Sequence, residues 1–282
     1  MSGGGGGGAP KWLMSAEELI HSPSRVDGVD AEEEKKLLCE TNWFVQECGK
    51  ELKLPPVAVM TGQTFLNRFY ALQSFARYDR WVAAQACLFL AAKVEEAPTK
   101  LYKIVTAAYS VRKEKCAQGT KDFDDMKKKI LSCERAVLFT IDFDVDVTAM
   151  SPVSPFSDLL TKVLKAGIVP SKKQQKFGQA GVKFISDSLR TNLCLQFDPK
   201  DIAAGCALLA IVFLKLYPKD AVILFKILSI SERKVKTICS AIIEIYLDVQ
   251  KCDELIVDLN KHNWIPDDLA ARRISQQPGS DD

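Results

Sequence analysis

Hydrophobic residues recur along the chain with helical spacing, and the most apolar stretch lies between Asp79 and Pro98. From Trp81 to Ala92 only Gln85 is polar, which predicts a helix that is buried on all sides. The stretch is too short to span a bilayer, which needs roughly 20 apolar residues. Asp79 is the predicted N-cap, and Pro98 disfavours helical geometry at the residue before it. The pattern therefore predicts the central helix of an all-helical domain.

Amphipathic stretches around this helix predict a five-helix set in the first half of the chain. Asp30 and the acidic residues after it suit a helix start, because negative charge is favourable there. Pro55 and Pro56 separate that helix from the next. A short helix with Ser15 as its cap is expected over residues 11–20, ahead of the set, and Pro23 cannot continue it. Besides the central helix, the set covers residues 30–52, 57–74, 99–110 and 121–141, with a polar loop over 112–120.

Several positions on these helices have the spacing of a single apolar face, which predicts that they face the core. The inward candidates are Val59, Leu66, Phe69, Tyr70, Ile130, Cys133, Val137, Leu138 and Ile141. Lys93 follows Phe89 and Leu90 on an apolar stripe of the central helix, where a cation needs an explanation.

After Ser151-Pro152 a second set of five helices is predicted. Its third helix starts at Asp198-Pro199, with proline at the first helical position, and is strongly apolar from Ile202 to Leu214. Pro218 is expected to end this helix, and Ser231 is the predicted cap of the fifth. The remaining predicted ranges are 154–165, 172–190, 219–228 and 231–249.

The two halves look like copies of one unit. At an offset of 120 residues, residues 82–84 (Val-Ala-Ala) match 202–204 (Ile-Ala-Ala), and Leu88-Phe89 matches Leu208-Leu209. Two apolar helices can match by composition alone, but the order of helix breaks on both sides agrees as well. We therefore interpret the chain as a duplicated five-helix domain.

The copies differ at two charged positions. Lys93 corresponds to Phe213, and Glu134 corresponds to Ser240 if Cys133 is aligned with Cys239. Because both copies share a scaffold, the difference favours a site in the first copy. Each residue also has a plainer interpretation: Lys93 as a last-turn lysine that bonds helix carbonyls, and Glu134 as a solvated residue beside the core face.

Composition narrows the function classes. A length of 282 residues suggests about two domains, and 47% apolar residues suffice for real cores. A net charge of +2 does not predict a nucleic-acid binder. The nine cysteines are scattered without a CxxC pair, which is typical of buried free thiols in a reducing compartment. Without a signal peptide or membrane span, the protein is expected to be intracellular and soluble, with no membrane partner.

The residues do not form a recognisable catalytic or metal site. The only histidines are His21 and His262, and no Ser/His/Asp grouping or HExxH motif is present. The glycine run 3–8 lacks the GK[ST] of a phosphate loop, and the aspartates at 122, 124 and 125 lack the EF-hand spacing. We therefore expect no catalysis, no cofactor, no metal and no small-molecule substrate.

At the two charged positions the chain resembles the cyclin family, over about residues 11–260. LFLAAKVEEAP (88–98) resembles the third helix of a cyclin box, and Glu134 within ILSCERAVLFTIDFDV (130–145) resembles the fifth-helix glutamate. HSPSR (21–25), LNRFYALQSF (66–75) and DSLRTNLCLQFDP (187–199) resemble the transcription class, close to cyclins T and K.

The resemblance implies an all-α fold, a tandem pair of five-helix cyclin-box domains with a short N-terminal helix. The implied organisation is a flexible Gly-rich tail (1–10), an N-terminal helix (11–29), a first box (30–148), a second box (149–260) and a C-terminal tail (261–282). The implied function is the regulatory subunit of a nuclear, transcription-type cyclin-dependent kinase that phosphorylates the C-terminal repeats of RNA polymerase II.

The resemblance also implies the kinase-binding residues. Lys93 and Glu134 match the lysine and glutamate that bond the backbone beside the kinase's mobile C-helix, and Val94, Glu96 and Phe143 match further contact positions. Two departures matter. Residues 30–52 have no MRAIL-like substrate patch, and the chain ends soon after the second box, without the long tail of many elongation cyclins.

Three alternatives stay open. The chain could be a cyclin of another class, or a TFIIB-like general transcription factor built from cyclin-like repeats. In the second case residues 127–129 and 172–173, all lysine, are the candidate nucleic-acid contacts, although charge runs usually form a solvated helix face. A helical scaffold without a kinase partner is the third alternative.

Overall fold

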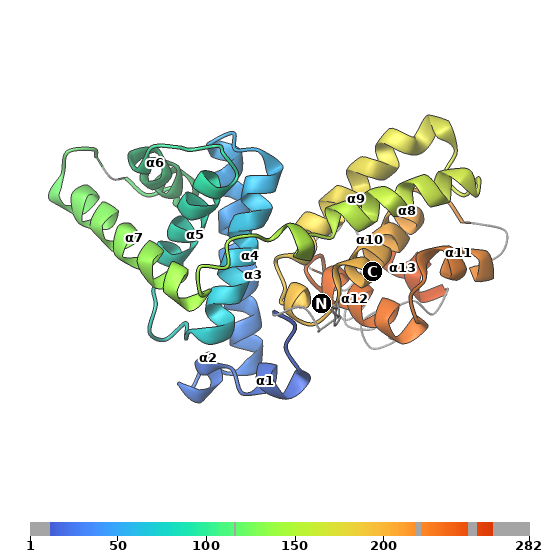
Figure 1. The fold of residues 1–282 in the computed structure, drawn as a ribbon, viewed down its shortest axis with the longest axis horizontal. Helices are drawn as coiled ribbons and strands as arrows, with labels where there is room; N and C mark the ends of the chain where they lie inside the picture. Colours follow the sequence, from blue (N-terminus) through green and yellow to red (C-terminus); the bar gives the residue numbers. More distant parts are fainter. Residues whose placement is uncertain (1–11, 116, 218–220, 248–252, 262–282) are drawn as a thin grey trace, which may run out of the picture. The chain divides into compact units, whose positions relative to one another are not determined.

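The computed structural model describes residues 12–115, 117–217, 221–247 and 253–261 (Figure 1). Within these residues every regular element is a helix, which confirms the predicted all-α class. The predicted tail at 1–10, the predicted tail at 261–282 apart from Lys261, and the helix stop at Pro218 lie outside the described residues. The fifth helix of the second set ends at Glu244, so its predicted end near Val249 was wrong. No helix in the described part is long and apolar enough to cross a bilayer.

The chain divides into two compact units. Unit 1 comprises Met1–Leu37, Phe44–Met150 and Cys194–Asp198, and unit 2 comprises Leu38–Trp43, Ser151–Leu193 and Pro199–Asp282. The helices of the first half are α1 (Ala16–Ile20), α2 (Pro23–Val26), α3 (Ala31–Glu51), α4 (Pro56–Leu72), α5 (Arg80–Val94), α6 (Leu101–Arg112) and α7 (Lys121–Thr140). The cyclin-box boundaries given above remain predictions.

The second half repeats a five-helix order. Its α-helices are α8 (Val153–Lys165), α9 (Gln174–Ser188), α10 (Pro199–Phe213), α11 (Ala221–Leu228) and α12 (Glu232–Glu244), followed by α13 (Asp253–Lys261). Of the 3-10 turns, η1 (Thr148–Met150) precedes α8, η2 (Ser171–Lys173) lies between α8 and α9, and η3 (Leu193–Leu195) lies between α9 and α10. Within the described residues, α3–α7 and α8–α12 are the two predicted sets of five.

Helix α5 is the centre of unit 1, as predicted, and contacts α4, α6 and α7. Small residues allow this close packing: a Cβ placed on Gly62 of α4 would lie 3.3 Å from the backbone of Leu88. The predicted inward residues are buried around α5, with Leu138 only partly so. Helix α10 has the same central role in unit 2, where it contacts α8, α9, α12 and α13.

The predicted cap of α5 is present. Asp79 has extended backbone geometry, and its Oδ1 accepts a hydrogen bond of 2.9 Å from the backbone N–H of Val82. This bond satisfies one of the donors that a helix N-terminus leaves without a partner.

We expect Asp79→Ala to lower the free energy of unfolding by about 1 kcal/mol, because the cap is lost from the central helix of unit 1. Asp79→Asn retains an oxygen that can accept the same bond and should recover most of the loss. Urea unfolding of the three proteins measures both effects. Equal stability of the alanine variant and the unsubstituted chain would contradict the role of the cap.

Several predicted boundaries were wrong for local reasons. The N-terminal helix begins at Ala16, directly after Ser15, whose predicted role as the cap is confirmed by a capping box, so residues 12–15 precede the helix. Pro23 does not merely follow the end of α1: it begins α2, with the Ser22 side chain as cap. The helix predicted at 99–110 is shifted to Leu101–Arg112, and the one predicted at 172–190 is split into η2 and α9. Helix α13 was not predicted.

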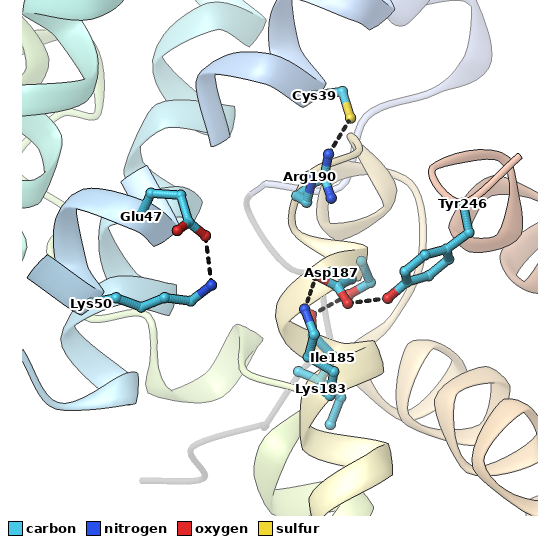
Figure 2. Close-up of polar contacts among 9 residues, drawn as sticks. Cys39, Glu47, Lys50, Lys183, Ile185, Asp187, Arg190 and Tyr246 are labelled. Atoms are coloured by element: carbon cyan, nitrogen blue, oxygen red, sulfur yellow. Dashed lines mark hydrogen bonds and ion pairs between the residues drawn. The ribbon is translucent and has the colours of Figure 1, made fainter. Parts of the chain in front are cut away.

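A buried carboxylate stabilises the interior of unit 2. Asp187, at the end of α9, is fully buried and accepts hydrogen bonds from the Lys183 ammonium at 2.8 Å and from the Tyr246 hydroxyl (Figure 2). Two partners compensate the cost of removing a charge from water. The motif 187–199, quoted above for the resemblance, therefore begins with a structural residue.

Candidate functional site

The structure brings Lys93 and Glu134 into direct contact. Lys93 lies in the last turn of α5 and Glu134 in the middle of α7, and the Lys93 Nζ to Glu134 Oε1 distance is 2.6 Å. The Lys93 side chain is 44% exposed and the Glu134 side chain 9% exposed. The two charged groups that distinguish the first copy from the second therefore form one pair, with its cation at the surface.

The surroundings explain a cation on an apolar stripe. The Lys93 ammonium lies 4.0 Å from the centre of the Phe89 ring, one helical turn earlier. This position is favourable because the ring face is electrostatically negative, while the methylene stem covers apolar surface. Lys93 thus bonds Glu134 rather than a last-turn carbonyl among the described residues. Glu134 is buried, so its interpretation as a solvated residue was wrong.

The pair retains unused hydrogen-bonding capacity. An ammonium has three N–H donors, and Lys93 uses one of them on Glu134. Glu134 Oε1 accepts that bond, and among the described residues no bond is formed by Oε2. The remaining donors and acceptor can bind the backbone N–H and C=O groups of another chain.

The end of α5 places Val94 and Glu96 beside the pair. The N–H of Ala97 bonds the carbonyl of Ala92 at 2.9 Å, and the N–H of Glu96 bonds that of Lys93 at 3.3 Å. This is a Schellman motif with Glu96 in the left-handed region at φ 53°, where glycine is usual. Val94 is partly buried and Glu96 is exposed.

The end of α7 carries the fifth predicted residue, Phe143. Asp142, at φ 54°, completes a Schellman motif, and Phe143 also has φ 54°. Phe143 is 58% exposed and packs against Phe139, which is 72% exposed, with ring centres 5.3 Å apart. Two exposed aromatic rings in contact are typical of a surface that binds a partner.

Phe139 was missed as a site residue. The apolar face of α7 is formed by Ile130, Cys133, Val137 and Ile141, and Phe139 lies off this face. The available signal in the sequence was therefore a large aromatic residue at a helix position that does not face the core. The contact of α5 with α7 brings Lys93 and Glu134 together. Val94 and Glu96 follow Lys93 along the chain, whereas Phe143 lies beyond the C-terminal end of α7.

The corresponding positions of the second copy lack this arrangement. Phe213 is 55% exposed and contacts the Phe184 ring edge-on at 6.2 Å. The Ser240 hydroxyl donates to the carbonyl of Lys236 within its own helix. Neither residue can provide the cation and carboxylate that the first copy presents.

The thiol beside Glu134 is not a reactive group. Cys133 is buried, and burial together with the charge of Asp79 raises its pKa to about 12. It therefore stays a neutral thiol near pH 7, unlike a nucleophilic cysteine, whose pKa is depressed. Among the described residues no group of His, Cys, Asp and Glu could hold a metal ion.

Comparison with known proteins places residues 12–146 in the family described as "Cyclin, N-terminal domain". Cyclin-T1-5 of Arabidopsis thaliana is 34% identical over 245 residues, 84% of this chain and 41% of that protein. Cyclin-K of Homo sapiens is 36% identical over 203 residues, 71% of this chain and 33% of that protein. The chain thus spans less than half the length of these curated relatives.

Solved structures share the fold. A chain of the yeast RNA Pol II CTD kinase CTDK-1 complex aligns with a TM-score of 0.65 at 18% identity, covering 94% of this chain and 82% of that one. A chain of the yeast TFIIK (Kin28/Ccl1/Tfb3) complex aligns with a TM-score of 0.58 at 20% identity, covering 81% of this chain and 96% of that one.

Proposed function

Because the chain belongs to the cyclin family, we propose that it is the activating regulatory subunit of a transcription-type cyclin-dependent kinase. The kinase would act in the nucleus on the C-terminal repeats of RNA polymerase II. The observation that carries the proposal is the Lys93–Glu134 pair, which leaves donors and one acceptor for a partner's backbone. The similarity to cyclins T and K supports the transcription class.

In this proposal the surface around the pair holds the kinase's mobile C-helix. Lys93 and Glu134 bond the exposed backbone beside that helix, while Val94 and the Phe139–Phe143 rings bury apolar surface against it. Glu96 contributes an exposed carboxylate, and its left-handed backbone sets the direction in which the side chain leaves the main chain. A C-helix held inward completes the Lys–Glu ion pair that an active protein kinase requires.

Activation is then a population shift. A ligand can only favour the active kinase by the difference in its affinities for the two states. Moving an equilibrium from 1:99 to 99:1 takes roughly 5.5 kcal/mol of such difference. A charge pair that becomes desolvated in the complex, together with two aromatic rings, is of the size that can supply much of this difference.

We expect the tagged full-length chain to capture a cyclin-dependent kinase from its own organism, identified by mass spectrometry of the bound proteins. The purified complex should phosphorylate a peptide of polymerase C-terminal repeats much faster than the kinase alone. Rates with and without the chain measure the stimulation. Capture of DNA or of general transcription factors, with no kinase, would contradict the proposal and favour the TFIIB-like alternative.

A further inference from the structure

The backbone at Phe143 is unusual even for this chain. Several helices end with a non-glycine residue in the left-handed region, as α5 does at Glu96 and α7 at Asp142. Phe143 is a second consecutive left-handed residue, beyond the position that the α7 Schellman motif requires. A bulky side chain at positive φ is strained, and such strain persists only when the surroundings impose it.

The residue that follows Phe143 is anchored from two directions. The Asp144 carboxylate accepts a 2.8 Å hydrogen bond from the Trp12 indole Nε1–H, and the Asp144 backbone carbonyl accepts a 2.9 Å bond from Arg68 Nη1. The Arg68 guanidinium also lies 3.9 Å from the carboxylate. These contacts fix both the side chain and the main chain directly after Phe143.

The two donors are themselves held in place. Arg68 lies on α4 and is 1% exposed, and Trp12 is 8% exposed. The guanidinium lies 4.7 Å from the centre of the Trp12 ring, which is a favourable contact for a cation and an aromatic face. Burial lowers the pKa of Arg68 and the charge of Asp144 opposes that change, but a guanidinium remains charged in either case.

We propose that Trp12 and Arg68 are positioning residues that hold Phe143 in its left-handed, exposed conformation through Asp144. The proposal rests on the proposed function, because Phe143 belongs to the surface assigned to the kinase. It also extends the determinants of kinase binding to residues outside that surface. Trp12, in the segment ahead of α1, fixes the backbone conformation of the loop that follows α7. Neither residue contacts the partner in this account.

Trp12→Phe is the variant that tests it. Phenylalanine keeps an aromatic face over Arg68 but removes the N–H that bonds Asp144. Tyr70→Phe is the matched control, since it removes one buried hydroxyl bond, to the carbonyl of Tyr78, in the same unit. Both variants lose one hydrogen bond, so a general loss of stability would affect them alike.

The first measurement needs no kinase. The amides of Phe143, Asp144 and Val145 bond the carbonyls of Leu138, Ile141 and Phe143. Hydrogen exchange in the full chain should show roughly 5-fold lower protection at residues 143–145 in Trp12→Phe and no change there in Tyr70→Phe. The same change in both variants, or in neither, would overturn the positioning role.

The second measurement is a double-mutant cycle on kinase affinity. We expect Trp12→Phe to weaken binding roughly 5-fold when Phe143 is present and to have no further effect in a Phe143→Ala background. Independent, additive losses would overturn the inference even if exchange changed. If the unsubstituted chain binds no kinase, the proposed function fails, whereas the exchange result still decides whether Trp12 holds the loop.

Discussion

Replacing Lys93 and Glu134 together with alanine is expected to abolish stimulation of the partner kinase while the chain stays folded. Hydrogen bonds to charged groups typically contribute about 1.5–3 kcal/mol each, so loss of those that the pair makes to the kinase should lower affinity roughly 30-fold or more. Co-purification and the rate on a polymerase repeat peptide measure the two effects. Circular dichroism of the free chain checks the fold.

A control with the same change in charge is available on α7. The Asp125–Lys128 pair is exposed, with 3.0 Å between its charged atoms, and exposed pairs contribute little to stability. Asp125→Ala plus Lys128→Ala should leave kinase stimulation unchanged. Full activity of the Lys93/Glu134 variant, or equal loss in the control, would refute the site assignment.

The single variants refine this test because the two partners are buried unequally. Lys93→Ala leaves the Glu134 carboxylate buried without its cation, which should destabilise the chain more than the double replacement does. Glu134→Ala leaves a cation that can reach water. The double variant is therefore the cleaner measure of binding.

Gly181→Ala is expected to destabilise unit 2, although it adds only one methyl group. A Cβ at this position would lie 1.8 Å from the Phe156 ring, which is 3% exposed and stacks on Phe177 with ring centres 5.6 Å apart. The ring is therefore enclosed and has little room to move aside. Overpacking of this kind typically costs about 1–3 kcal/mol, with larger values where the site is rigid.

Gly178→Ala, one turn earlier on α9, is the matched control. Nothing lies within 4 Å of its added methyl group, so the substitution should stabilise the chain by about 0.5–1 kcal/mol through helix propensity. Chemical unfolding of the two variants should shift in opposite directions. Shifts of the same sign would show that the Gly181–Phe156 contact does not govern how α8 and α9 pack.

The fold was predictable where the hydrophobic pattern was strong. The apolar run from Trp81 to Ala92, in which only Gln85 is polar, predicted a buried central helix, and α5 is one. Short elements were harder: the Ser15 cap of α1 was predicted, but the Ser22 cap of α2 was not, because a proline can begin a helix as well as end one. Helix α13 was missed because no break signal was recognised after the fifth helix.

The site was only partly predictable. The difference between the two copies pointed to Lys93 and Glu134, which lie on separate helices and meet in space. The contact of Trp12 and Arg68 with Asp144 could not be read from the sequence, because it joins residues 132 and 76 positions apart and depends on how α4 packs. Positive φ at Phe143 likewise has no signal of its own in the sequence.

The left-handed backbone of Phe143 implies that stability of the fold and binding of a partner favour different residues at this position. Glycine at this position would relieve the backbone strain and stabilise the fold, because glycine adopts positive φ without steric cost. The same substitution would remove the exposed aromatic ring of Phe143. A screen for heat resistance alone would therefore favour variants that lack the ring proposed to contact the kinase.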